Sequence, residues 1–191
     1  GDHVIPLANA LMARFPLVVA SQDWHPANHA SFAANHPGRR VGEVIKVAGV
    51  PQVLWPTHCV QGTPGAALAA ALDAGRIQHL VRKGEDPAID SYSAFFDNGH
   101  QRSTGLGDYL RAQRVSHLFI AGLATDYCVK FSVLDALAEG FDVTLIEDAS
   151  RGVNLAAGDV ERAVEAMREA GAQVTTTSRV LADATLFRGN L

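Results

Sequence analysis

The sequence predicts an α/β fold, a mostly parallel sheet with helices on both faces in a three-layer α/β/α arrangement. Two observations predict it. Strand patterns and helix patterns alternate along the 191 residues, and the strand patterns are unbroken apolar runs, such as 116–124 and 142–150. Unbroken apolar strands are typical of parallel sheets, because both sides of each strand are covered. A hydrophobic content of 48% agrees with a packed globular domain.

The first third of the chain contains a helix, a strand and a long loop region. Apolar residues recur at helical spacing over 2–14, which predicts an amphipathic helix with Asp2 as its cap. The run "FPLVVAS" at 15–21 predicts a buried strand. Residues 26–63 are rich in Pro, Gly, His and Asn and contain one short strand pattern, at 41–49. A loop region of this length inside a compact domain is usually either functional or disordered.

The rest of the chain alternates strictly. The Ala-rich segment 63–75 predicts a helix, with Thr63 as cap, Pro64 in the first turn and Gly75 as stop. After it, the patterns predict strands at 79–84, 116–124, 142–150 and 173–181, and helices at 105–115, 125–141 and 156–171. We see no repeat and no linker in this alternation, so one domain is expected.

Composition and charge narrow the classes of function. The formal net charge is −4 and no long run of Lys or Arg occurs, so nucleic acid and anionic membranes are not expected as partners. No apolar stretch reaches the length that a bilayer requires. Two cysteines do not make a disulfide framework, so a reducing, cytoplasmic setting is expected. The sequence leaves the oligomeric state open, a homo-oligomer included.

Polar side chains follow the predicted strands, where parallel sheets bind their ligands. Asp23 and His25 come directly after the first strand, and side chains two residues apart point to the same side of an extended chain. A carboxylate and an imidazole so placed can begin a site for a borderline cation. His58, in the loop "VLWPTHCVQGTPGA", would be a third ligand. Three protein ligands with open positions are typical of a catalytic or substrate-binding metal site.

Each of these residues also has a simpler role open to it. Asp23 can cap the turn after the strand, and His58 can bond to carbonyl groups of its own loop. His29 can join the ion, support its ligands from outside or be solvated. The spacing alone does not decide between these roles.

Cys128 lies three residues after Thr125, in the first turn of the helix predicted at 125–141. A helix N-terminus lowers the pKa of a thiol and offers backbone N–H groups to a developing oxyanion. Cys128 is therefore a candidate nucleophile, or else a buried thiol on a core-facing helix. Lys83, at another strand end, can stabilise a thiolate or hold a carboxylate, or be solvated. Cys59 is expected to be a small buried hydrophobe.

Four groups of residues together resemble one known family. They are "QDWHP" at 22–26, "WPTHCVQGTPGA" at 55–66, "KG" at 83–84 with "SYSAF" at 91–95, and "GLATDYCV" at 122–129. In this order, across the whole chain, they are similar to the bacterial nicotinamidases of the isochorismatase-like cysteine hydrolase superfamily. We therefore expect a single domain of that type over residues 1–191.

The resemblance implies hydrolysis of nicotinamide to nicotinate and ammonia, a step of NAD salvage, and hydrolysis of pyrazinamide as well. In the family an Asp, a Lys and a Cys form the catalytic triad, and Lys83 and Cys128 match the last two. The backbone N–H groups of Ala124 and Cys128 would form the oxyanion hole, and the peptide bond before Ala124 would be cis. Trp55 would flank the substrate ring, with Tyr92 nearby.

The resemblance also implies a cofactor. The family's metal ligands fall on Asp23, His25 and His58, with water completing the shell of one divalent ion, which is zinc, iron or manganese. This ion is expected to take the pyridine nitrogen of the substrate. Relatives in the superfamily that act on other molecules generally lack this set of ligands.

One departure concerns the general base. The family opens with a strand that carries the motif Asp-x-Gln, and its Asp takes the thiol proton. The sequence begins about where the family's first helix begins, so we expect it to be an N-terminally incomplete piece of the domain. Two other functions stay open: an isochorismatase-like amidohydrolase acting on another small molecule, and a non-catalytic metal-binding module if that strand is absent.

Overall fold

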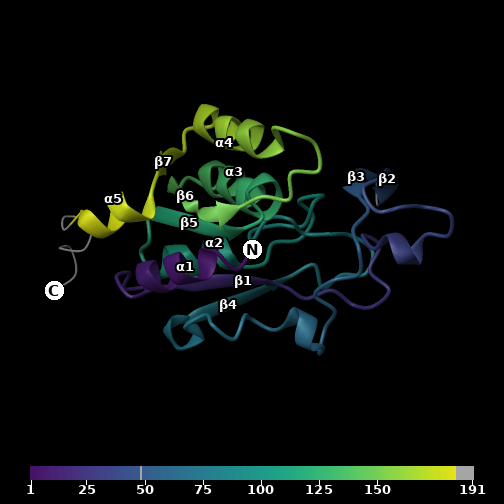
Figure 1. Cartoon of the computed structure of the whole chain (residues 1–191), viewed down its shortest axis with the longest axis horizontal. Coiled ribbons are helices and arrows are strands. Elements are labelled where there is room, and N and C mark those ends of the chain that lie inside the picture. The colour runs from purple at the N-terminus through teal and green to yellow at the C-terminus, as the bar shows by residue number, and fades with distance from the viewer. Residues whose placement is uncertain (48, 184–191) are drawn as a thin grey trace.

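The computed structural model describes residues 1–47 and 49–183, and Figure 1 shows their arrangement. Its helices are α1 (Val4–Met12), α2 (Leu106–Ala112), α3 (Lys130–Ala138), α4 (Asp159–Glu169) and α5 (Thr177–Ala182). Its strands are β1 (Val19–Asp23), β2 (Val44–Val47), β3 (Val50–Val53), β4 (His79–Lys83), β5 (His117–Leu123), β6 (Asp142–Arg151) and β7 (Gln173–Thr175). This order of strands and helices confirms the predicted α/β class.

The strands form two parallel sheets and one antiparallel hairpin. β5, β6 and β7 lie in that order in one sheet, and both pairings are parallel. β1 pairs in parallel with β4, whereas β2 and β3 form an antiparallel hairpin away from both parallel sheets (Figure 1). Among the described residues no β-pairing joins β1 to β5, so each of these two strands has one unpaired edge.

Helices cover both faces of the sheet β5–β6–β7, as predicted. α1 and α5 pack against β6 on one face, and α3 and α4 pack together on the other (Figure 1). Successive residues of β6 point to opposite faces, which divides the apolar core in two. Leu145 belongs to the larger cluster with Met167 of α4, whereas Ile146 belongs to the smaller cluster with Leu11 of α1 and Val180 of α5.

The prediction of a helix over 63–75 is wrong. Only short 3-10 turns form there, at Pro64–Ala66 and Ala74–Arg76, although Ala favours helices. Most of the segment is exposed and only Ala66 is buried, so little apolar surface is available to stabilise so short a helix. Asp2 does not cap α1 either, because His3 takes the N-cap position and no side chain caps that helix.

Other boundaries also differ from the prediction. β1 begins at Val19, later than expected, and extends to Asp23. β2 lies inside the predicted strand pattern, but its partner β3 lies in the predicted loop region. The last strand, β7, ends at Thr175, and α5 takes up the rest of the segment. β5 is partly exposed rather than fully buried, because one of its edges is unpaired.

The lengths of the helices show whether any of them could span a membrane. No helix within residues 1–47 and 49–183 combines the length and the apolar character needed to cross a bilayer. The helices are instead one to three turns long and pack on the sheet.

Candidate active site

The ends of β1 and β4 bring a carboxylate and an ammonium to one point. The two strands are parallel neighbours, and their register pairs Asp23 with Lys83 at the carboxyl ends. Lys83 Nζ lies 2.6 Å from Asp23 Oδ1. The sheet itself therefore builds this ion pair, at the edge where parallel sheets bind ligands.

Lys83 is the central side chain of the site. It is 4% exposed, and its ammonium contacts three groups: Asp23 Oδ1, Ser91 O at 2.7 Å and Cys128 Sγ at 3.3 Å. Burial acts to lower the pKa of Lys83, but the sulfur of Cys128 and the carboxylate of Asp23 outweigh burial and hold this pKa above its usual range. The ammonium stays charged, with a carboxylate, a carbonyl oxygen and a sulfur all within 3.3 Å of it. Lys83 is therefore not solvated.

Cys128 lies in a π-helical turn, Thr125–Val129, between the end of β5 and the start of α3. The first turn of an α-helix, which the sequence predicts here, does not form. Burial raises the pKa of the Cys128 thiol, and Lys83 only partly offsets burial. The expected lowering of this pKa is therefore not found. Conversion of the thiol to a thiolate needs a proton acceptor.

Ala124 joins β5 to this π-helical turn. The peptide bond between Leu123 and Ala124 is cis, as the resemblance implies. The carbonyl oxygen of Ala124 accepts from Tyr127 N at 3.1 Å and from Val129 N at 3.0 Å. These two hydrogen bonds close the turn on Ala124, and Cys128 lies between the two donor residues in the sequence.

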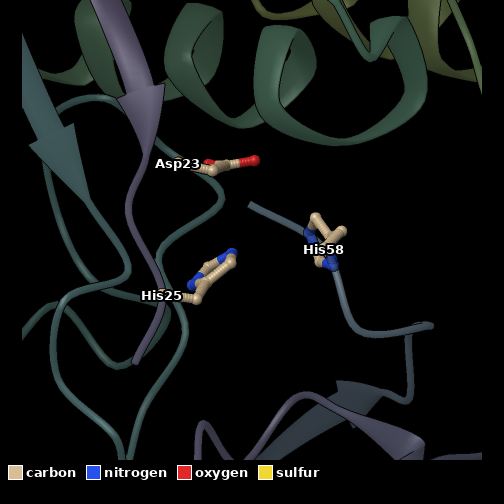
Figure 2. A group of neighbouring side chains, drawn as sticks. All are labelled: Asp23, His25 and His58. Atoms are coloured by element: carbon tan, nitrogen blue, oxygen red, sulfur yellow. The ribbon is translucent and has the colours of Figure 1, made fainter. Parts of the chain in front are cut away.

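Asp23, His25 and His58 form a cluster with the donor set of a metal site, and Figure 2 shows the three side chains around a common space. Their ligand atoms all lie within 4.8 Å of one another. His25 Nδ1 donates to Gly84 O at 2.9 Å and His58 Nδ1 donates to Pro56 O at 2.8 Å, so both Nε2 lone pairs are left for a ligand. Burial lowers the pKa of His25, which keeps its ring neutral, as metal ligation requires. These residues fit one divalent ion.

Asp23 belongs to both the metal cluster and the ion pair. Burial acts to raise the pKa of Asp23, but Lys83 outweighs burial, so the pKa is lowered and the carboxylate stays ionised. Lys83 connects the cluster to Cys128, because its Nζ lies 2.6 Å from Asp23 Oδ1 and 3.3 Å from Cys128 Sγ. The predicted cation ligands and the predicted nucleophile therefore share one small site.

Three aromatic rings pack edge to face close to Cys128. The ring centroids of Trp55 and Tyr127 are 4.7 Å apart, those of Tyr92 and Tyr127 5.4 Å, and those of Trp55 and Tyr92 6.5 Å. Trp55 and Tyr92 are predicted from the sequence, but Tyr127 is not. Its position directly before Cys128, in "TDYC", is the signal that identifies it.

Comparison with known proteins identifies the family. The isochorismatase domain family matches residues 18–179. The nicotinamidase of Escherichia coli K12 is 48% identical over 180 residues, which make up 92% of this chain and 84% of that protein. The chain belongs to the isochorismatase family.

Solved structures of isochorismatase-family proteins have the same fold. A nicotinamidase and pyrazinamidase of Acinetobacter baumannii is 42% identical, with a TM-score of 0.91 that covers 94% of this chain and 87% of the other. The pyrazinamidase of Pyrococcus horikoshii in complex with zinc is 35% identical, with a TM-score of 0.72 over 92% and 86% of the two chains. Within the isochorismatase family this chain groups with the nicotinamidases, and it is a hydrolase that acts on an amide bond.

Gly84 fixes the orientation of His25 in this isochorismatase-family site. Its carbonyl oxygen accepts from His25 Nδ1, and its φ is +66°. A Cβ at this position would lie 2.5 Å from His25 Nδ1, well inside contact distance. The "KG" motif therefore has a physical reason: Lys83 contacts the thiol of Cys128, and the glycine lets the His25 ring lie against the backbone.

Gly84→Ala is expected to weaken binding of a divalent ion by about 10- to 100-fold, because the new methyl group displaces the His25 ring. Competition titration of zinc against a chelator measures this change. Gly38→Ala is the matched control, since Gly38 also has a positive φ, of +79°, but no heavy atom lies within 4 Å of the added Cβ. Equal ion affinity in the two variants would contradict the role given to Gly84.

His29 lies behind the cluster rather than in solvent. It is fully buried, and its ring centroid lies 4.3 Å from that of His25. Ser31 N donates to His29 Nδ1 at 3.3 Å, and Ser31 Oγ lies 2.7 Å from the same atom, so Nε2 carries the proton. The buried carboxylate of Asp90 forms a second group with His25 and His29, and the sequence patterns do not predict it. This arrangement favours a supporting role for His29, from outside the ligands.

The metal-free protein is expected to lose stability as the pH falls from about 6.5 to about 4. Burial lowers the pKa of His29 from 6.5 to about 4. Between these values the unfolded chain binds a proton that the folded protein does not, so the free energy of unfolding falls by up to about 3 kcal/mol at the acid end. Urea unfolding in a chelator at pH 7 and pH 4.5 measures this loss.

His25 contributes with the same sign, because burial lowers its pKa too. The slope of the free energy of unfolding against pH reports how many more protons the unfolded chain binds than the folded protein. His29→Gln is therefore expected to lower this number by about one, and His25 keeps the slope above zero. His3→Gln, at an exposed histidine, is the control substitution. A slope that His29→Gln does not alter would show that His29 titrates normally in the folded protein.

Proposed function

We propose that this protein hydrolyses nicotinamide to nicotinate and ammonia, that it accepts pyrazinamide, and that it acts in NAD salvage. One observation carries the proposal: Lys83 Nζ lies 2.6 Å from Asp23 of the cation cluster and 3.3 Å from Cys128 Sγ. A cation site so close to a nucleophile suits a small ring that carries both a ligating nitrogen and a carboxamide. The names of the relatives support the same substrate.

The reaction follows as acyl transfer in two steps. Cys128 gives up its thiol proton, and its sulfur attacks the carboxamide carbon; the C–N bond breaks, and the nitrogen takes a proton and leaves as ammonia. Water then attacks the thioester, which releases nicotinate and restores the thiol. Lys83 stabilises the thiolate, and the N–H groups of Ala124 and Cys128 hold the oxyanion. Each such donor contributes about 3–4 kcal/mol to the barrier reduction.

Ring binding in this proposal depends on the metal cluster and the aromatic side chains. Asp23, His25 and His58 would hold one divalent ion, which is zinc, iron or manganese. When bound, this ion would orient the substrate ring through its nitrogen. Trp55 and Tyr92 would flank the ring, because both aromatic groups lie in edge-to-face contact with Tyr127, the neighbour of Cys128. The zinc complex of the Pyrococcus relative makes zinc the first ion to test.

The proton acceptor in the proposal is the Asp of the family's Asp-x-Gln motif, on a strand that would pair between β1 and β5. Its support is the unpaired edge of each of these two strands. β1 ends at Asp23 and β5 leads into the turn of Cys128, so a parallel strand between them would also end at the site. Within the described residues, Asp23 is the carboxylate joined to the thiol through Lys83.

A cytoplasmic location and a small-molecule substrate, with neither nucleic acid nor a membrane as a partner, complete the proposal. Both cysteines are free in the structure, which agrees with a reducing compartment. The oligomeric state is left open.

Ammonia release from nicotinamide is the deciding assay. It is run with zinc, iron(II) or manganese on residues 1–191 alone and on the same chain extended by its upstream coding segment. We expect the extended chain to hydrolyse nicotinamide and pyrazinamide, but neither N-carbamoyl amides nor isochorismate. Turnover of the last two alone would instead indicate a different isochorismatase-like activity. One bound ion without turnover in the extended chain would indicate a metal-binding module.

A further inference from the structure

Gln52 is a buried amide at the centre of a polar network that the reaction does not use. It lies on β3 and is 1% exposed. Its Nε2 lies 3.0 Å from Tyr92 Oη, 3.1 Å from Asp90 Oδ2 and 2.8 Å from the carbonyl oxygen of Val53. The two protons of this amide nitrogen are therefore shared among three acceptors, of which Asp90 and Tyr92 are buried.

The network reaches both aromatic side chains assigned to the substrate ring. Trp55 Nε1 donates to Tyr92 Oη at 3.2 Å, so the same phenol oxygen receives protons from Trp55 and from Gln52. Asn98 closes the network, because its Nδ2 donates to Gln52 Oε1 at 3.4 Å and its Oδ1 accepts from Tyr92 N at 2.9 Å. Each ring is thus held through its polar atom as well as by packing.

The position of Gln52 explains why an amide is useful there. Within the described residues, the β2–β3 hairpin pairs with no other strand, yet Trp55 lies only two residues after the end of β3. The hydrogen bonds of Gln52 tie this hairpin to the loop that carries Asp90 and Tyr92. An apolar residue would fill the same space, but it would leave two buried polar atoms of Asp90 and Tyr92 without this donor.

We propose that Gln52 is a positioning residue that fixes the ring planes of Trp55 and Tyr92 and so sets the affinity for the substrate ring. The inference rests on the proposed function. Gln52 acts through the two aromatic side chains and takes no part in breaking the amide bond. Its removal therefore affects ring binding more than the chemical step, because the nucleophile is held separately by Lys83.

The first test is Gln52→Met in the extended, metal-loaded chain, since Met keeps the length and shape of the side chain but donates no proton. We expect the KM for nicotinamide to rise about tenfold and kcat to stay within about threefold. Gln113→Met, at an exposed glutamine, is the matched control and changes neither constant. A fall in kcat at unchanged KM would overturn the proposal.

A double-mutant cycle with Tyr92→Phe makes the test specific. Tyr92→Phe removes only the phenol oxygen that Gln52 and Trp55 share, so the double variant should raise KM by clearly less than the product of the two single effects. Effects that multiply fully would mean that Gln52 acts independently of Tyr92 and would overturn the proposal. If Gln52→Met does not fold, Tyr92→Phe alone still tests the shared bond in the spectra described next.

The indole N–H signals of the protein give a readout that does not depend on turnover. The chain has two tryptophans, and Trp24 lies against Arg82, away from this network. In Gln52→Met and in Tyr92→Phe we expect the Trp55 signal to shift and exchange faster with water, while the Trp24 signal stays in place. An unmoved Trp55 signal would refute the proposal, whereas failure of the extended, metal-loaded chain to release ammonia from nicotinamide would refute only the proposed function.

Discussion

Cys128→Ala is expected to lower kcat for nicotinamide by at least about 10⁴-fold, because no other described group can replace the sulfur as nucleophile. Lys83 holds this sulfur at 3.3 Å, and Asp23 beyond it belongs to the cation cluster, so a ring bound at the cluster would have the thiol next to its carboxamide carbon. Ammonia release in the extended, metal-loaded chain measures the loss. A trapped thioester, seen as a mass increase on Cys128 after rapid quenching of the unaltered protein, provides direct evidence for the intermediate.

Cys59→Ala is the matched control, because it removes the other thiol in the protein. Cys59 lies beside His58 in a loop, with a positive φ of 46° that alanine can share, and burial raises its pKa. We expect this variant to keep kcat within about threefold. Ammonia release by Cys128→Ala at a rate near that of the control would mean that the thiol is structural and that the reaction proceeds without a covalent intermediate.

The convergence of Asp23, Lys83 and Cys128 could be predicted from the sequence because each follows an apolar strand pattern. Parallel strands end at one edge of a sheet, so residues far apart in the chain must meet there once the strands pair. Here the pairing of β1 with β4 places Asp23 beside Lys83, and β5 carries Cys128 to the same edge. This part of the site depends on topology, and topology follows from the apolar pattern.

The supporting residues could not be predicted in the same way. Gln52 and Asp90 are joined by a hydrogen bond across 38 residues, and neither strand nor helix periodicity relates them. His29 is fixed in one tautomer by Ser31, which depends on the local fold of a loop. The prediction of a helix over the Ala-rich segment 63–75 fails for the opposite reason: its helix propensity is real, but the folded protein buries little of its apolar surface. Tertiary packing therefore overrides the local preference of this segment.

Lys83→Met is expected to lower kcat/KM by about 10³-fold or more and to slow the reaction of Cys128 with iodoacetamide by about 10- to 10³-fold. The ammonium is the cation next to the sulfur, and its loss raises the pKa of the thiol further, which leaves less thiolate at a given pH. Asp23 also loses its partner, so the free energy of unfolding should fall by about 3–5 kcal/mol. Lys46→Met, at an exposed lysine, is the control and changes none of these quantities.

The alkylation rate separates the two roles that Lys83 can have. A purely structural lysine would lower stability when replaced, but Cys128 would then react with iodoacetamide at an unchanged or higher rate, because a loosened site exposes the sulfur. A lysine that stabilises the thiolate gives the reverse result, a slower rate in a less stable protein. Bound zinc adds a second distinction: Asp23, His25 and His58 remain in Lys83→Met, so the ion should be retained while activity is lost. Loss of the ion together with the activity would place the main effect of Lys83 on the metal cluster rather than on the thiol.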